Sequence, residues 1–168
     1  MTKTIKYTVV DTSVGSLCVA YSADGIIAAR LTDDENEFVA DCADELDSVV
    51  EHDSNPPSAL LAAVEGRLQG DVQLTFSLPG RTPFQRAVLE YVASIPRGEM
   101  RTYGEVALAV GHPGAARAVG EVMRTNRIPV LIPCHRVVRS GGDVGQYTPD
   151  PSIKRRLLIE EGALLPTR

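Results

Sequence analysis

The sequence contains no run of apolar residues long enough to cross a membrane, and it contains few cysteines. Its first residues, Met1 to Lys6, lead directly into an alternating segment and lack the apolar stretch of a signal peptide. The three cysteines, Cys18, Cys42 and Cys134, are an odd number and widely spaced, which excludes a disulfide framework and a CxxC metal pair. We therefore expect a cytoplasmic protein or, in a nucleated cell, a nuclear one.

Metal ligands are equally sparse. Together with the cysteines, the three histidines (His52, His112 and His135) could in principle assemble a zinc site, but their spacing matches no established zinc pattern. We predict that the protein uses neither a metal nor a cofactor.

The chain also has no overall excess of positive charge, since 17 Lys and Arg stand against 22 Asp and Glu. A net charge of −5 argues against a nucleic-acid-binding protein, yet the average hides an asymmetry. Residues 1–81 carry 5 basic and 14 acidic side chains, a net charge of −9, whereas residues 82–168 carry 12 and 8, a net charge of +4. This asymmetry indicates that only the second half meets a polyanion; alternatively, both halves are simply solvated surfaces.

The first half is predicted to form a small domain, residues 1–78, of antiparallel strands and helices. Strands are expected within residues 5–31, where apolar and polar residues partly alternate and Asp24-Gly25 is a strong hairpin signal. The acidic stretch that follows indicates a solvated helix near Phe38–Val50. The remaining expected elements are a helix that opens at Pro56 and closes at Gly70, a strand over Val72–Phe76 and a linker at residues 79–81.

The second half, residues 82–168, is predicted to be mainly helical, which gives an α+β fold class overall. Thr82 to Gln85 and Thr102 to Glu105 are both capping-box patterns that begin helices. The second of these helices stops at Gly111, and a tight turn then starts another helix that ends near Asn126. Two short helices joined by a Gly/Pro turn are typical of a helix-turn-helix, here winged, although many helical hairpins bind nothing. A final helix is expected between Asp150 and Gly162.

The most unusual stretch runs from Leu131 to Val138, because it places a cysteine next to two basic residues. Positive charge favours the thiolate form of Cys134, and the thiolate is a nucleophile. His135 is adjacent, so the two side chains diverge and a water molecule between them is easier to arrange than a direct hydrogen bond. Glu160 and Glu161 are the candidates to orient the histidine. The alternative is that Cys134 and His135 are ordinary buried residues.

These residues resemble a known family, the O6-alkylguanine-DNA alkyltransferases, also called methylated-DNA–protein-cysteine methyltransferases. The similarity rests on IPCHRVV, preceded by RAVGEVMRTN and followed by VGQY, and it extends over residues 82–162 through TPFQ, IPRGE, TYGEVA and LLIEEG. It implies a protein that binds duplex DNA through the minor groove and rotates the damaged guanine out of the stack. A cysteine then takes the alkyl group from O6 irreversibly, so each molecule acts once.

The resemblance implies roles residue by residue. Cys134 resembles the acceptor, His135 the base that deprotonates it through water, and Glu161 the carboxylate that orients His135. Asn126 resembles the side chain that braces the active-site turn. Arg136 is expected to be structural or to face a phosphate.

The remaining implied roles concern DNA and the damaged base. Tyr103 resembles the residue that contacts the 3′ phosphate and donates a proton to guanine N3, and Arg117 resembles the arginine that fills the gap left by the flipped base. The other residues expected to bind DNA are Ala116, Thr102 and Arg124. The expected lining of the substrate pocket is Met123, Val137, Ser140, Val144, Gly145, Tyr147 and Thr148.

The chain departs from the pattern that the resemblance implies after its tyrosine: the family usually has a small residue and two glycines there, and this chain has Thr148-Pro149-Asp150-Pro151. Two prolines make a stiffer wall, so we expect methyl groups to be accepted and benzyl groups to react poorly. The expected partner is double-stranded DNA containing O6-alkylguanine, with O4-alkylthymine as a further candidate substrate. We expect no membrane association, no obligate protein partner, and a monomer with the potential for cooperative binding to DNA.

Three other functions remain open for the sequence. Relatives of this family recognise alkylated guanine without removing it, but they lack the cysteine. A cysteine hydrolase acting on a small substrate would instead show repeated turnover. A helix-turn-helix regulator would bind a specific sequence, usually as a dimer.

Overall fold

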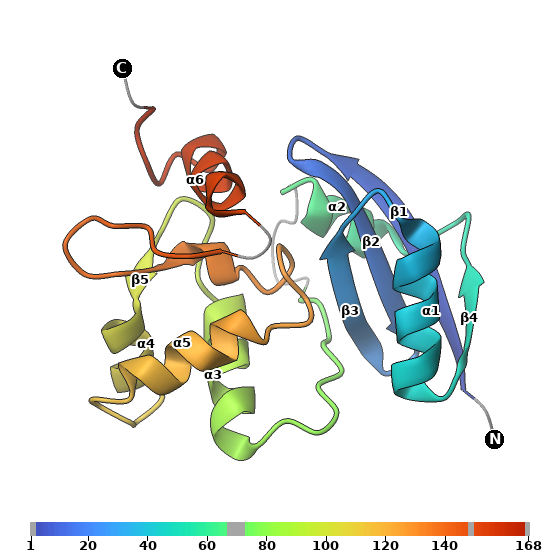
Figure 1. The fold of residues 1–168 in the computed structure, drawn as a ribbon, viewed down its shortest axis with the longest axis horizontal. Coiled ribbons are helices and arrows are strands. Elements are labelled where there is room, and N and C mark those ends of the chain that lie inside the picture. The colour runs from blue at the N-terminus through green and yellow to red at the C-terminus, as the bar shows by residue number, and fades with distance from the viewer. Residues whose placement is uncertain (1–2, 67–72, 148–149, 167–168) are drawn as a thin grey trace. The chain divides into compact units, whose positions relative to one another are not determined.

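A computed structural model describes residues 3–66, 73–147 and 150–166 of the chain. The chain divides into two compact units, residues 1–79 and 80–168 (Figure 1). Strands dominate the first unit and helices the second, which confirms the predicted α+β class. No helix among the described residues combines the length and the apolar character that a membrane crossing requires.

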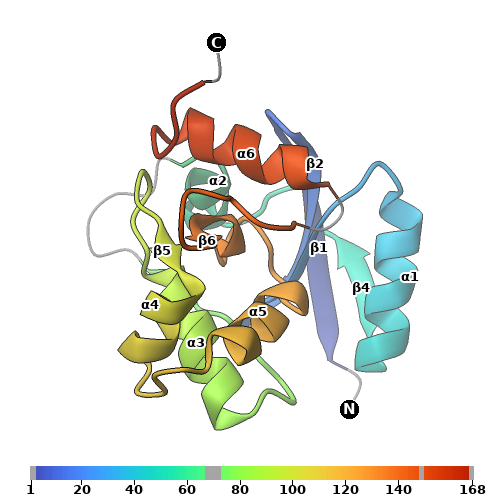
Figure 2. The ribbon, with the colours of Figure 1, turned by 60° about the vertical axis from the view of Figure 1, so that its left-hand side comes forward.

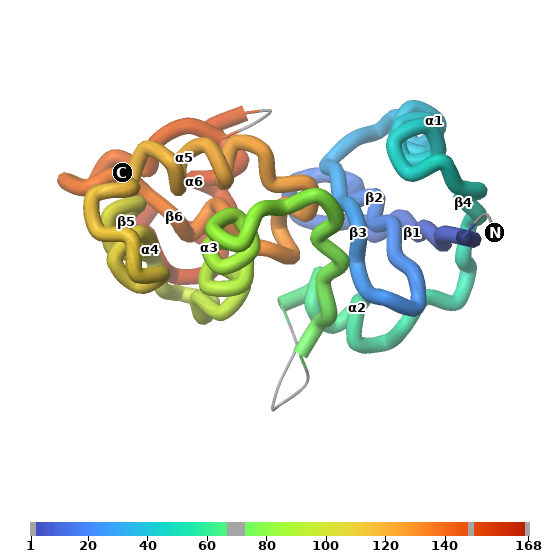
Figure 3. The backbone as a smooth tube through the Cα atoms, turned by 90° about the horizontal axis from the view of Figure 1, so that it is seen from below, coloured from blue at the N-terminus to red at the C-terminus, as the bar shows by residue number. Residues whose placement is uncertain are grey.

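The first unit is built on a four-stranded sheet with the order β3-β2-β1-β4. Two hairpins connect β1 (Thr4–Thr12), β2 (Gly15–Ser22) and β3 (Gly25–Leu31) as antiparallel neighbours. The helices α1 (Glu35–Leu46) and α2 (Ser58–Val64) lie on opposite faces of the sheet (Figure 3).

The fourth strand, β4 (Val49–His52), corrects two predictions for this unit. It pairs in parallel with β1, so the sheet is mixed and the prediction of a purely antiparallel sheet was wrong. It also replaces the end of the helix expected near Phe38–Val50. The carboxylate of Asp34 caps α1 by accepting a hydrogen bond from Glu37 N at 2.9 Å, which starts the helix earlier. Asp47 then ends it in a left-handed conformation with φ 45°.

The segment after α2 differs from the prediction as well. The helix ends at Val64, while Leu68, Gly70 and Val72, which the sequence prediction included, lie outside the described residues. Over residues 73–76 the expected strand was wrong, because the chain there makes only an isolated parallel bridge between Phe76 and Ile26.

The core of the first unit lies between the sheet and α1. Cys18 is fully buried inside β2, as the strand pattern predicts, and Cys42 faces it from α1 within the same cluster. The apolar side chains of this core are Ile5, Tyr7, Cys18, Ala20, Ile27, Ala28, Phe38 and Cys42.

The second unit contains the predicted capped helices. In α3 (Pro83–Ala93) the Thr82 hydroxyl accepts a hydrogen bond from Gln85 N and the Gln85 side chain accepts one from Thr82 N, which confirms the first capping box. The same reciprocal pair joins Thr102 and Glu105 at the start of α4 (Tyr103–Ala109), which confirms the second.

The helix-turn-helix is formed by α4 and α5 (Ala116–Arg124), which pack against each other and against α3 (Figure 2). The turn between them uses Gly111 and Gly114 at φ 81° and 87°, conformations that favour glycine. A two-stranded parallel sheet joins β5 (Arg101–Thr102) to β6 (Val137–Val138). The last helix, α6 (Pro151–Glu160), packs against the short 3₁₀ turn η1 (Cys134–Arg136).

Candidate active site

The chain reaches Cys134 through a constrained turn that follows α5. Asn126 fixes this turn from both sides, because its Nδ2 donates to Ile132 O at 3.1 Å and its Oδ1 accepts from Ile128 N at 3.0 Å. Within the turn Val130 has φ 70°, an unfavourable conformation for a β-branched residue that the surrounding hydrogen bonds must hold. The family resemblance implied that Asn126 braces the turn, and this role stays a prediction; its two hydrogen bonds connect it to Ile128 and Ile132.

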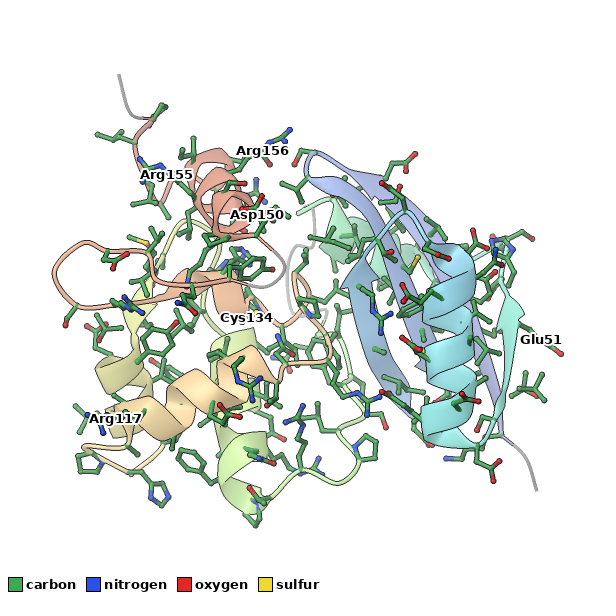
Figure 4. All side chains as sticks on the ribbon, in the orientation of Figure 1. Glu51, Arg117, Cys134, Asp150, Arg155 and Arg156 are labelled. Atoms are coloured by element: carbon green, nitrogen blue, oxygen red, sulfur yellow. The ribbon has the colours of Figure 1, made fainter. Side chains whose placement is uncertain are left out.

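Cys134 is the first residue of η1 and is only 7% exposed (Figure 4). Burial raises the pKa of its thiol, because the charged form loses its hydration. Polar groups of Asn126 and Tyr147 and the positive charge of Lys154 act in the opposite direction and favour the thiolate. Burial alone would therefore keep the thiol protonated and unreactive, but the surrounding groups stabilise the negative charge of the thiolate.

His135 is 1% exposed, and its two ring nitrogens have different environments. Nε2 lies 2.9 Å from Glu161 Oε1, whereas Nδ1 is buried and has no hydrogen-bond partner among the described residues. Burial lowers the pKa of His135 despite the opposing effect of Glu161, so the ring is neutral at pH 7. Because a carboxylate only accepts, the proton resides on Nε2 and Nδ1 keeps its lone pair. Such a nitrogen is a general base.

Glu161 connects His135 to Arg136. Arg136 donates to both Glu161 oxygens, from Nε at 2.9 Å and from Nη2 at 2.8 Å, and its Nη1 donates to Ile95 O at 2.6 Å. Burial would raise the pKa of Glu161, but the hydrogen bonds from His135 and Arg136 lower it to about 2. Arg136 thus donates to Glu161 and to the backbone of Ile95, and its structural role stays a prediction. Glu160, the other candidate for orienting the histidine, instead lies 3.5 Å from exposed Arg156.

Tyr103 lies among several parts of this unit. Its ring lies next to Gly120 of α5, where an added Cβ atom would be 3.9 Å away. Its hydroxyl lies next to Gly145 of the loop after β6, where an added Cβ atom would be 3.6 Å away. Burial, followed by the charge of Cys134, raises the pKa of Tyr103, so the phenol keeps its proton at neutral pH and is available as a donor.

The residues predicted to bind DNA have different surroundings. Arg117 is exposed in the first turn of α5 and points outward (Figure 4), while the neighbouring Ala116 is partly buried. Arg124 is exposed at the other end of α5, where its Nε donates to Glu121 at 2.9 Å. The Thr102 hydroxyl already accepts the helix-capping hydrogen bond from Glu105 N at 3.1 Å.

The residues predicted to line the pocket divide by burial. Met123 and Val137 are buried, and the chain enters the following loop through Ser140, which is exposed. Val144, Gly145 and Tyr147 are half-buried. Burial, followed by the charge of Cys134 and a hydrogen bond with its sulfur, raises the pKa of Tyr147, so the buried hydroxyl of Tyr147 is a neighbour of the thiol. Thr148 lies outside the described residues.

Lys154 is a functional candidate that the sequence interpretation missed. It is 1% exposed in α6, and its Nζ donates to Val137 O at 2.6 Å and to Gln146 O at 3.4 Å. The signal was present, because Lys154 precedes Leu157 and Leu158 by three and four positions and therefore shares their inward face.

Metal binding finds no support in the side-chain geometry. Across residues 3–66, 73–147 and 150–166, no three His, Cys, Asp or Glu side chains are grouped as they would be to hold a metal ion. The absence of a metal nevertheless stays a prediction.

Comparisons with known proteins agree with this arrangement. A family model for the DNA-binding domain of 6-O-methylguanine DNA methyltransferase matches residues 83–163. The methylated-DNA–protein-cysteine methyltransferase of Methanothermobacter thermautotrophicus is 42% identical over 122 residues, which are 68% of this chain and 68% of that protein. The constitutive enzyme of that name from Bacillus subtilis is 37% identical over 147 residues, 84% of this chain and 85% of the relative.

A solved structure extends the similarity to nearly the whole chain. The crystal structure of Mycobacterium tuberculosis OGT in complex with DNA has a TM-score of 0.72 and 30% sequence identity, and the match covers 94% of this chain and 93% of that one. Both units therefore have counterparts in a protein that binds DNA. The chain belongs to the family of methylated-DNA–protein-cysteine methyltransferases.

Proposed function

We propose that this protein repairs DNA by direct damage reversal, transferring a methyl group from O6 of guanine in duplex DNA to the sulfur of Cys134. The observation that carries the proposal is the buried arrangement of a thiol, the unpaired Nδ1 of His135 and the carboxylate Glu161. These are a nucleophile, a base and the group that orients the base. Family membership supports the same reaction.

The first step is deprotonation of the thiol. A water molecule carries the proton from Cys134 Sγ to His135 Nδ1, and Glu161 stabilises the resulting imidazolium through Nε2. Asn126 and Lys154 favour the thiolate that remains. This proton transfer explains why a thiol whose pKa is raised by burial can still act as a nucleophile.

The second step is an in-line displacement at the methyl carbon. The Sγ–C bond forms while the C–O6 bond breaks, and the electron pair of that bond moves onto guanine O6. Tyr103 is proposed to donate its proton to guanine N3, which neutralises the departing base. Its raised pKa supports this assignment, because the phenol carries its proton at neutral pH. Both the thioether and the repaired guanine are stable, so each protein reacts once.

DNA binding is assigned to α5 of the helix-turn-helix. Arg117 is proposed to enter the duplex and occupy the space of the flipped guanine, since it is exposed on the first turn of that helix. Ala116 allows the backbone close to the DNA, while Thr102, Tyr103 and Arg124 contact phosphates. The positive charge of residues 82–168 supports an anionic partner.

The proposed partner is double-stranded DNA that contains O6-alkylguanine, with O4-alkylthymine as a further candidate. The proposal requires no metal, no cofactor, no membrane and no second protein chain, and it places the protein in the cytoplasm. Pro151 begins α6, and Pro149 lies outside the described residues, so the prediction that benzyl groups react poorly rests on the sequence.

The experiment counts repaired guanines per protein with duplex DNA in excess. We expect restored guanine to reach a plateau at one per protein for O6-methylguanine, and slower transfer from O6-benzylguanine. If restored guanine continued to increase beyond one per protein, the protein would be a hydrolase that turns over, and the proposal would be rejected. Selective binding without any restored guanine would replace it with a damage-recognition module. Equal rates for methyl and benzyl groups would contradict the pocket prediction alone.

A further inference from the structure

Lys154 is a buried charge whose surroundings do not neutralise it. Its side chain is 1% exposed, and within the described part of the chain Nζ donates to two backbone carbonyls, Val137 O and Gln146 O. Nζ also lies 5.8 Å from the centroid of the Tyr103 ring. No carboxylate of the described residues pairs with it within 4.0 Å. A lysine buried in this way is unfavourable unless an opposite charge compensates it.

The groups that face Lys154 identify that opposite charge. From η1 come Cys134 and the neutral His135, and from the loop after β6 come Arg139 and Asp143. Asp143 is 62% exposed and already bound to Arg139 at 3.2 Å, so water and that arginine compensate much of its charge. Cys134, in contrast, is buried in η1, the turn against which α6 packs, and each group favours the charged form of the other.

We propose that Lys154 is a positioning residue for alkyl transfer, whose ammonium serves as the counter-ion of the Cys134 thiolate and joins the strand after the active-site turn to the loop at Gln146. The proposal rests on the assignment of Cys134 as the nucleophile. Burial lowers the pKa of Lys154 to about 8, so the ammonium is still protonated at pH 7, where the thiolate is needed. Its hydrogen bonds to Val137 O and Gln146 O hold two segments that border the thiol.

Three substitutions separate charge from hydrogen bonding at this position. Lys154→Met keeps the approximate length and removes both, Lys154→Gln keeps a donor without the charge, and Lys154→Arg keeps both. Arg156→Met is the matched control, because Arg156 lies on the same helix but is exposed (Figure 4). The probe is iodoacetamide on the full-length protein, with alkylation of Cys134 followed by peptide mass against pH.

We expect the neutral variants to raise the pH midpoint of Cys134 alkylation by about one unit, which is roughly a tenfold lower rate at pH 7. Lys154→Arg and Arg156→Met should keep the midpoint of the wild-type protein. An unchanged midpoint in folded Lys154→Met or Lys154→Gln would overturn the proposal, since a purely structural lysine would alter stability without moving the midpoint. If Lys154→Met does not fold, the comparison of Lys154→Gln with Lys154→Arg decides the question.

Parallel assays with O6-methylguanine duplex distinguish this proposal from the function on which it rests. A midpoint that depends on Lys154 in a protein that takes no methyl group from DNA would reject the proposed function alone. A protein that takes the methyl group, with a midpoint independent of Lys154, would reject the counter-ion role alone. We expect the neutral variants to slow methyl transfer at pH 7 by about the same tenfold factor and to recover part of that loss at higher pH.

Discussion

Replacing Glu161 by glutamine should reduce both the stability of the helical unit and the rate of methyl transfer. The carboxylate accepts hydrogen bonds from His135 and from two nitrogens of Arg136, and its side chain is only 6% exposed. Glutamine preserves the shape but brings its own donors toward Arg136, whose buried charge then loses its partner.

The magnitude follows from the depressed pKa of Glu161, which is about 2 against an ordinary 4.5. At 1.36 kcal/mol per pKa unit this difference corresponds to about 3 kcal/mol for the buried carboxylate. Because the folded-state pKa is the lower one, this stabilisation is complete above pH 4.5 and is lost as the pH falls toward 2. The stability difference between wild type and variant should therefore at least halve between pH 7 and pH 3.

Urea unfolding followed by circular dichroism measures this difference at both pH values. Glu160→Gln is the matched control, because Glu160 is the preceding residue and its ion pair with Arg156 is exposed; the expected change is within about 0.5 kcal/mol. A Glu161→Gln variant that resembles Glu160→Gln, or whose stability loss is equal at pH 7 and pH 3, would refute the reasoning.

The same variant tests the orientation of the base. The glutamine amide can donate to His135 Nε2 and so leave the proton on Nδ1, where the lone pair is needed. Single-turnover rates of methyl transfer should fall by about a hundredfold or more. A rate within threefold of the wild type would show that Glu161 does not set the tautomer of His135.

Three further outcomes are expected. Arg117→Ala should slow methyl transfer from duplex DNA by about tenfold or more and leave iodoacetamide alkylation of the thiol unchanged, because only base flipping needs the arginine; an unchanged duplex rate would contradict its role. Thr82→Ala should lower the free energy of unfolding by about 1 kcal/mol through loss of the α3 cap, and a neutral effect in urea unfolding would contradict this. Gly25→Ala should destabilise more than Gly15→Ala by about 1 kcal/mol or more, since only at Gly25 would the new Cβ meet a backbone oxygen, at 2.5 Å; equal melting temperatures would be the contrary result.

Local signals in the sequence predicted the helical unit well. Thr82 and Thr102 each begin a helix through a hydrogen bond to a residue three positions later, so the pattern and the structure share the same short-range cause. Gly111 and Gly114 mark the turn of the helix-turn-helix through another short-range effect, because their positive φ angles favour glycine. The pairing of His135 with Glu161 spans 26 residues, and only the family resemblance singled out Glu161.

Long-range contacts account for what the sequence did not predict. The segment Val49–His52 is a strand because β1 offers it a free edge, and nothing in its four residues identifies that partner. Lys154 was overlooked because lysine is ordinarily assigned to the surface, even though its spacing from Leu157 placed it on the buried face. Its counter-ion role depends on a thiol twenty residues earlier in the chain.

The most direct test of the account is the intact mass of the protein after incubation with a duplex that carries one O6-methylguanine. The account predicts the addition of one methyl group to each molecule, located by peptide mass on Cys134, and no addition in Cys134→Ser. The variant should keep the fold and the duplex binding of the wild type. A methyl group found on Cys18 or Cys42, or an unchanged mass while the guanine is restored, would contradict the assignment of Cys134 as the acceptor.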